Sequence, residues 1–585
     1  MPSVTIAEKK AAVAANPAVD FAMCFVGFAP SSPLAAGQLS ATYGDPNAII
    51  TDYGYSDMTG AAAQAVTRTP GNPGPVPVCI YATPATTAGS YGSVFDAGVT
   101  GTAAPSANGA EAPTGTYQPW LKVRTAFTIG TAGGDGWASL DGGRTQQLVT
   151  FGTATTYNFP SGDGWPGAGG QCGFTLGTAA QTYNASDVLY TSTKPPQFGT
   201  PDLYSAGPPA TGALAVIAES AQQFGMIVLT EPIDSTYFST LTAGLDYFAT
   251  QGKKAPLLVV RFRDPYGAFA TTSTGSQTLP VTSFTVASTA GAPPSGTLTI
   301  GSTSIAYTSI TDATTFGGCT GGTGTIAAGT AVTQAAETDA AYITACQTFY
   351  DAHHDDRILC MAGSGWLTDA FTGYRYLRSG MAAALARIQS FAVVAGQVGE
   401  QLTQSPGYVA RGPLEGFSLV DDSGNLVGHD ESSRGGISQA AGGPVGGMLS
   451  FYYNRNAANL GTYVWKAPVL YPVNGEILNM MDRRLANALE RTAVGVSWQS
   501  IQGADIYDPD TLALDLGIKH STEQKIWSAI RKGYPKEFQN ANDPDLVQLA
   551  STVTVVGDAV TMTGTLAVRP YGYTDAINLT YSVKR

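Results

Sequence analysis

The chain has 585 residues and carries 30 Lys and Arg against 43 Asp and Glu, a formal net charge of −13. Hydrophobic residues make up 43% of it and charged residues only 12%, which is typical of a globular protein and excludes a disordered one. Phosphate binding needs clustered Lys and Arg, so this composition argues against nucleic acid or an anionic membrane surface as a partner. The length corresponds to about four domains.

The arrangement of the apolar runs predicts an α/β core. Strand-like runs occur at 21–30, 76–81, 226–230, 256–262 and 357–363, and helix-like runs at 58–66, 214–224, 237–250, 338–353 and 376–399. Strands that are apolar throughout and separated by helices are typical of a parallel sheet covered on both faces. We therefore expect a core built from βαβ units.

Two β-rich insertions interrupt this pattern, at 118–193 and at 271–335. The first contains Asp141-Gly142, a strong hairpin signal, and the second is rich in Thr, Gly and Ser with almost no charge. We expect each insertion to project outward from the core, with its two ends close together. Residues 84–117 are expected to form loop, and residues 401–450 are Gly-rich and irregular.

The remaining segments are an N-terminal arm (1–20) and an α+β region from 451 to 585. In the latter, Leu478, Met481, Leu485 and Leu489 form one predicted helical face, with Arg483, Arg484, Glu490 and Arg491 off it. A second helix is expected at 521–534, followed by two or three strands with a turn at Gly557-Asp558.

The six cysteines form no C-x-x-C pair and have no metal-ligand spacing to a histidine. We expect free buried thiols, assembly in a reducing compartment, and no metal or other cofactor. No run of about 18 apolar residues is present, and the first 20 residues lack the features of a secretory signal, so we expect no membrane insertion.

The chain contains no complete P-loop, no H-E-x-x-H and no G-x-S-x-G turn. His353 to Asp356 could in principle bind a metal, but a polar turn between a helix and a strand is the favoured interpretation. Ser139 to Thr145 (SLDGGRT) resembles the Asp-box of sialidases, in one copy and with Gln146 in place of the Trp. A single copy excludes a propeller and favours a lone hairpin. We therefore expect no enzyme activity and no catalytic residues.

Read as a whole, the chain resembles the contractile phage tail sheath proteins. The resemblance rests on the helix MMDRRLANALERTAVGVSW (480–498), on Val568-Arg569-Pro570 followed by the final strand AINLTYSVKR, and on the N-terminal order of arm, CFVGFAP, short helix and PVPVCIY. It implies a virion tail subunit, assembled in the host cytoplasm, that forms hexameric rings stacked into a helical tube. The implied partners are further copies of the chain, the tail tube protein, and the baseplate and tail terminator proteins.

The resemblance also implies a division of the chain. Residues 21–117, 194–270 and 336–450 would form the α/β core, the last with its Gly-rich loop, and 451–585 a C-terminal sheath domain. The main rival hypothesis is a β-rich phage protein that binds a receptor or a glycan through the insertions. A third is a glycosidase built around the Asp-box-like hairpin.

Two sites follow from the C-terminal sequence. Four cations gather in and just after the second helix: Lys525, Arg531, Lys532 and Lys536. The resemblance implies that they face an acidic tube, and a solvated basic face is the alternative. In the final strand one face is apolar, as expected for a half-buried strand: Ile577, Leu579, Tyr581 and Val583. This strand either closes its own sheet or joins a neighbour's, and the resemblance favours the second, with the arm as companion link.

Overall fold

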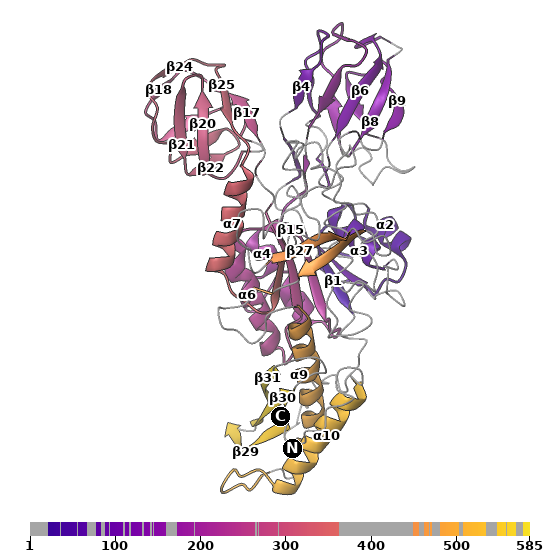
Figure 1. Ribbon diagram of the computed structural model, residues 1–585, viewed down its shortest axis with the longest axis vertical. Helices are drawn as coiled ribbons and strands as arrows, with labels where there is room; N and C mark the ends of the chain where they lie inside the picture. The colour runs from indigo at the N-terminus through magenta and orange to yellow at the C-terminus, as the bar shows by residue number, and fades with distance from the viewer. Residues whose placement is uncertain are drawn as a thin grey trace, which may run out of the picture.

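The computed structural model describes residues 22–361 and the segments 448–454, 461–466, 469–470, 480–501, 507–533, 547–556, 559–568 and 577–584. Within the first range it leaves out residues 36, 55, 67–77, 84–87, 93, 109–111, 116, 118, 132–133, 141–142, 144–145, 160–171, 192, 264–265, 267 and 290–291. The predicted arm at 1–20 and the predicted helix at 376–399 lie outside the described residues. The described parts form an elongated molecule, with two β lobes at one end, an α/β core in the middle and the C-terminal domain at the other end (Figure 1).

A seven-stranded sheet forms the core, in the order β2-β1-β15-β16-β26-β27-β28. Its strands are β1 (Met23–Phe28), β2 (Val78–Thr83), β15 (Met226–Ile233), β16 (Leu257–Phe262), β26 (Ile358–Met361), β27 (Met448–Asn454) and β28 (Gly461–Lys466). Neighbouring strands are parallel from β2 to β27, and only β28 runs antiparallel to its neighbour. These pairings confirm the predicted parallel sheet. Strands such as β16 are buried along their whole length, as expected for a sheet covered on both faces.

Helices pack on both faces of this sheet. They are α2 (Pro46–Tyr53), α3 (Asp57–Val66), α4 (Thr200–Leu203), α5 (Ala213–Glu219), α6 (Ser235–Thr250) and α7 (Asp339–Ala352). Side chains of α5, α6 and α7 share one apolar cluster with Val26 and Val260, whereas Met58 of α3 lies against Gly27, on the opposite face. α5 ends five residues before the predicted Phe224, because the Ser220 hydroxyl donates to carbonyl oxygens on both sides of it and forms a turn.

Gly27, in β1, leaves room for a buried carboxyl group at the end of β15. The Glu231 Oε1 atom accepts a hydrogen bond from the Phe28 N–H at 2.6 Å, and Oε2 accepts one from the Thr230 hydroxyl at 3.1 Å. Burial raises the pKa of Glu231 to about 7. A Cβ atom at position 27 would lie 2.4 Å from Thr230 Oγ1, 2.8 Å from Glu231 Oε2 and 2.9 Å from Met58 Cβ. Only glycine fits here without displacing all three neighbours.

We expect Gly27→Ala to lower the free energy of unfolding of the core by about 1–3 kcal/mol, the usual cost of overpacking. Urea unfolding followed by tryptophan fluorescence would measure the shift. Gly44→Ala is the matched control, because nothing lies within 4 Å of its Cβ position. Equal unfolding midpoints for Gly27→Ala and the parent chain would contradict this account of the packing.

The first β lobe contains twelve short strands. They are β3 (Ser90–Tyr91), β4 (Phe95–Gly98), β5 (Ser106–Ala107), β6 (Trp120–Thr125), β7 (Phe127–Thr128), β8 (Asp135–Ser139), β9 (Gln147–Thr150), β10 (Thr156–Asn158), β11 (Gly173–Thr175), β12 (Thr182–Tyr183), β13 (Val188–Tyr190) and β14 (Thr193–Lys194). The expectation of loop over 84–117 was wrong for β3, β4 and β5, which pair with β14, β13 and β11. The ends of the predicted insertion at 118–193 meet as predicted, since the Thr193 N–H donates to the Tyr117 carbonyl at 2.9 Å.

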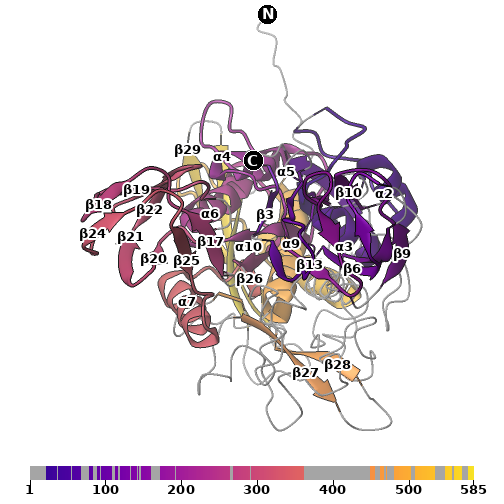
Figure 2. The same ribbon diagram turned by 90° about the horizontal axis from the view of Figure 1, so that it is seen from above.

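The second β lobe is formed by nine strands around its own apolar cluster. They are β17 (Phe269–Thr272), β18 (Gln277–Leu279), β19 (Ser283–Thr285), β20 (Gly296–Ile300), β21 (Thr303–Tyr307), β22 (Ser309–Asp312), β23 (Thr315–Gly317), β24 (Gly324–Ile326) and β25 (Ala331–Gln334). Its first and last strands pair antiparallel, with Phe269 opposite Gln334, so the chain enters and leaves at one point as predicted. Seen from above, the two lobes lie on opposite sides of the molecule (Figure 2).

The C-terminal domain packs two helices on a three-stranded sheet. Its elements are α9 (Met480–Ile501), α10 (Leu516–Gly533), β29 (Val547–Val556), β30 (Ala559–Val568) and β31 (Ile577–Lys584). The sheet is antiparallel in the order β29-β30-β31. Leu485 and Leu489 of α9 share a buried cluster with Ile526 and Ile530 of α10 and with side chains of the sheet.

All six cysteines are free and buried, as predicted. Burial raises the pKa of each thiol for which a shift is resolved, for example to about 12 for Cys346. Thiols of this kind hold almost no thiolate near neutral pH and are poor nucleophiles.

Candidate interaction surfaces of the C-terminal domain

Helix α9 joins the C-terminal domain to the core through polar contacts. Arg483 Nη1 lies 3.0 Å from Asp356 Oδ2, in the turn between α7 and β26. Glu490 forms an ion pair with Lys254, and Asn487 Nδ2 donates to the Ala255 carbonyl at 3.2 Å; both partners precede β16. The helix therefore contacts the core on one side and its own domain on the other.

This double contact corrects one prediction. Arg483 and Arg484 were expected off the buried face, yet they are only 6% and 3% exposed. The helical pattern identified the face toward the C-terminal sheet through Leu485 and Leu489. It did not identify the face toward the core, because that face is anchored by charged and amide groups rather than by apolar ones.

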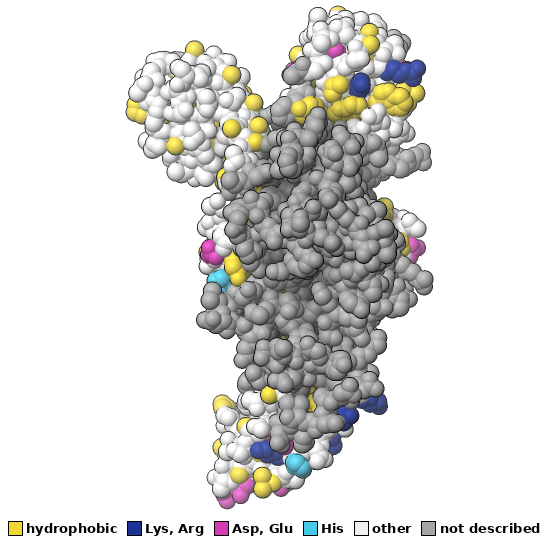
Figure 3. Space-filling view, viewed as in Figure 1, with side chains coloured by type: hydrophobic (Ala, Val, Ile, Leu, Met, Phe, Trp, Pro, Cys, Tyr) yellow, Lys and Arg dark blue, Asp and Glu magenta, His cyan; other side chains and the backbone are white. Residues whose placement is uncertain are grey.

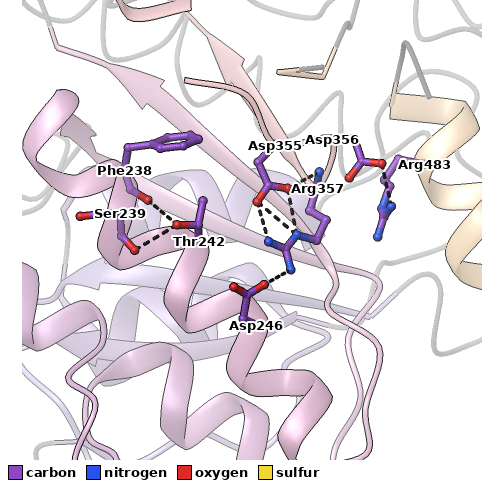
Figure 4. Close-up of polar contacts among 8 residues, drawn as sticks. All are labelled: Phe238, Ser239, Thr242, Asp246, Asp355, Asp356, Arg357 and Arg483. Atoms are coloured by element: carbon purple, nitrogen blue, oxygen red, sulfur yellow. Dashed lines mark hydrogen bonds and ion pairs between the residues drawn. The ribbon is translucent and has the colours of Figure 1, made fainter. Parts of the chain in front are cut away.

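The turn that receives Arg483 is itself held by ion pairs (Figure 4). The Arg357 guanidinium contacts Asp355 Oδ2 at 2.6 Å and reaches Asp246 Oδ1 on α6 at 2.7 Å. These partners raise the pKa of Arg357 although burial opposes the charge. His353 packs against the Phe238 ring instead, with centroids 4.4 Å apart. The acids of the 353–356 segment thus bind arginines, and no group of three metal-ligating side chains occurs among the described residues.

Helix α10 begins five residues earlier than predicted, at Leu516. The Asp515 carboxylate accepts a hydrogen bond from the Ile518 N–H at 2.9 Å and so caps the first turn. Leu516 is 76% exposed and lies off the apolar face, whereas Ile518 in the same turn packs against the domain's buried cluster. Thr522, Ile526 and Ile530 form the buried face.

The predicted cations lie on the opposite, exposed side of α10. Lys525, Arg531 and Lys532 are exposed, and none of them forms an ion pair with any residue that the structure describes. The nearby acid Glu523 is turned inward, where its carboxylate accepts a hydrogen bond from the Leu549 N–H of β29 at 2.8 Å. Lys536 lies outside the described residues. The helix therefore presents positive charge to solvent while its acid is held against the sheet.

The predicted final strand exists as β31 and pairs with β30 along its whole length. Val568 is opposite Ile577 and Thr561 is opposite Lys584, without a shift in register. The register partners of Leu579, Tyr581 and Val583 are residues of the buried face of β30, Leu566, Gly564 and Met562. Within the described residues, the outer edge of β31 has no further strand beside it. The outer edge of β29 is partly covered, because the Leu514 N–H donates to the Ser551 carbonyl at 2.9 Å and the Val553 N–H donates to the Leu512 carbonyl at 3.0 Å. In the single chain the strand thus pairs within its own sheet and leaves an open edge at β31.

No helix among the described residues is long and apolar enough to cross a membrane. The hairpin that resembles an Asp-box has a structural role, because the Ser139 hydroxyl accepts a hydrogen bond from the Gly143 N–H at 2.9 Å and so closes the turn.

No protein-family model matches the chain, and no curated protein matches its sequence. Among solved structures, the sheath tail protein from Listeria innocua superposes with a TM-score of 0.38 at 10% identity, covering 96% of this chain and 94% of that one. The sheath tail protein from Desulfitobacterium hafniense superposes with a TM-score of 0.34 at 13% identity, covering 96% of each chain.

Proposed function

We propose that this chain is a non-enzymatic structural subunit of a contractile phage tail sheath. Copies of it would form hexameric rings, stack into a helical tube around the tail tube, and contract to drive that tube through the host envelope. The subunit would be assembled in the host cytoplasm, become part of the virion tail, and meet the baseplate and tail terminator at the two ends of the sheath.

The observation that carries the proposal is the C-terminal sheet β29-β30-β31, whose outer edge at β31 has no partner strand in the described residues. An open edge invites pairing with another chain, and here the chain's own last strand forms that edge. A contact that uses different surfaces on its two sides produces a ring where the rotation closes and a helical filament where it does not. We therefore propose that β31, through Ile577, Leu579, Tyr581 and Val583, links neighbouring subunits, with residues 1–20 as a second link.

The remaining parts have roles consistent with this one. The exposed cations of α10, with Lys536 beyond its end, would contact an acidic tail tube. Both β lobes enter and leave the core at single points, so they would decorate the outer surface without interrupting the core. The domain limits of the sequence analysis are part of this proposal, with the start of the first β lobe moved to β3. Contraction would be a rigid-body rearrangement of subunits that stay linked by their strands.

Negative-stain electron microscopy of the purified full-length chain tests the proposal. We expect tubes built of stacked rings, in the absence of any other protein. A discrete glycan-binding protein or a glycosidase would instead give separate particles of fixed size at every concentration. Such particles, or hydrolysis of a glycan that is lost on replacing one pair of carboxylates, would contradict the sheath assignment.

A further inference from the structure

The first β lobe has a sheet with one buried and one open face. The sheet has the order β4-β13-β6-β8-β9. Leu121 and Ala138 point to one side, where they join the lobe's buried aromatic cluster. Lys122, Trp137 and Leu148 point to the other side and are at least partly exposed, whereas Trp120 and Ser139 on that side are buried. This outer face belongs neither to the core nor to the proposed subunit links.

Strand register places a continuous row of side chains across the outer face. Val188 of β13 pairs with Lys122 of β6, Lys122 pairs with Trp137 of β8, and Trp137 pairs with Leu148 of β9. Directly opposed residues lie side by side, so the indole of Trp137 sits between a cation and an aliphatic side chain. Trp137 is half-buried, and Leu148 is 48% exposed although it is a large hydrophobic residue. Hydrophobic and basic side chains accordingly appear together on this lobe (Figure 3).

The described part of the connection between β8 and β9 packs on Trp120, beside this row. Gly143 has φ +94°, and a Cβ atom there would lie 3.1 Å from the Trp120 ring, so the turn rests directly on that indole. The Gln146 amide donates to the Gly143 carbonyl at 2.7 Å and supports the turn from within. Trp120 is consequently covered, whereas Trp137, two residue pairs further along the strands, is partly exposed.

The charged side chains on this outer face favour an anionic ligand. Lys122 is exposed and has no ion pair with any described residue. Arg124, on the same face, lies 3.8 Å from Asp135, and both side chains of this loose pair are partly exposed. A nucleic acid needs several clustered cations along its phosphate backbone, whereas this face offers Lys122 and the loosely paired Arg124. A carboxylated sugar needs only a local cation beside a flat apolar ring.

We propose that the outer face around Trp137, Lys122 and Leu148 binds a polysaccharide that carries carboxylate groups. The apolar face of one sugar ring would stack on the Trp137 indole, and its carboxylate would lie at the Lys122 ammonium group. Exposed aromatic and aliphatic surface next to polar groups is a usual mark of a binding site. This assignment does not depend on the proposed function, because a discrete protein could use the same face.

Binding of the full-length chain to immobilised polygalacturonate, hyaluronan and alginate tests the assignment, with neutral dextran as comparison. We expect binding to at least one acidic polymer, weakened by salt, and weaker binding to dextran. Trp137→Ala should reduce the affinity by about tenfold, and Trp137→Phe should restore most of it, because an aromatic ring is retained. Lys122→Gln should weaken binding to the acidic polymers and leave binding to dextran unchanged.

Ile310→Ser is the matched control, since Ile310 is an exposed hydrophobic residue of the other lobe, 36% exposed. It should bind like the parent chain. Failure of the parent chain to bind any of the three acidic polymers would overturn the assignment, as would equal affinity of Lys122→Gln and the parent chain. If Leu148→Ser abolished a self-association of the chain instead, the face would be a contact between copies and the assignment would again be wrong.

Discussion

A disulfide between positions 565 and 580 is expected to stop the chain from forming tubes. Thr565 of β30 and Thr580 of β31 are register partners, and opposed residues of antiparallel strands lie at Cα distances that a disulfide spans. In the double variant Thr565→Cys, Thr580→Cys, oxidation would hold β31 in its own sheet. If β31 has to pair with a neighbour, the oxidised protein stays monomeric and reduction restores polymerisation.

The native thiols should not interfere, because all six are buried. Each single cysteine variant is a control and should polymerise under both conditions. A second measurement uses tubes that are formed reduced and then oxidised. Exchanged strands would then join position 565 of one subunit to position 580 of the next, giving a ladder of multimers on a non-reducing gel. Tubes from the oxidised double variant, with only monomer on that gel, would show that β31 remains in its own domain.

The α/β core was predictable because its strands are buried on both faces. A run such as that of β15, buried at nearly every position, can only be a core strand or part of a buried helix, and the flanking helices decide between the two. Capping residues also help to predict where a helix begins. The Thr338 hydroxyl accepts a hydrogen bond from the Ala341 N–H, and α7 begins one residue after the predicted start. Here, local pattern and tertiary environment agree.

The first β lobe was less predictable because its strands are too short for a period to appear. Ser90–Tyr91 and Ser106–Ala107 have two residues each, and their pairing with β14 and β11 joins segments far apart in the chain. The outer face around Trp137 could not be predicted from the sequence for the same reason. Its residues are ordinary in sequence and become a surface only through the register of four strands.

The candidate surfaces of the C-terminal domain were likewise predictable only in part. The exposed side of α10 follows from helical periodicity, because Ile526 and Ile530 fix the buried face and place Lys525 away from it. The inward turn of Glu523 depends on a backbone N–H of β29, which no helical pattern contains. The same holds for Arg483, whose partner Asp356 is more than a hundred residues away. Polar contacts between distant segments leave no local signal.

Reversing the cations of α10 is expected to abolish binding of the subunit to the tail tube while leaving the subunit folded. The triple variant Lys525→Glu, Arg531→Glu, Lys532→Glu changes exposed side chains without ion pairs to described residues, so each should change the free energy of unfolding by no more than about 0.5 kcal/mol. If these cations face acidic tube residues, reversal turns attraction into repulsion and should weaken co-sedimentation with purified tail tubes by at least about tenfold. Raising the salt concentration should weaken tube binding by the parent chain, because screening reduces the attraction between the cations and the acidic tube. It should also reduce the repulsion of the variant, so the difference in tube binding between the two proteins should become smaller.

The double variant Lys122→Glu, Arg124→Glu is the control, because it reverses charges on the first β lobe, at the opposite end of the molecule (Figure 1). It should bind tubes like the parent chain, so equal losses in both variants would mean that overall charge, rather than α10, governs the contact, and unchanged binding of the triple variant would mean that these cations only face solvent.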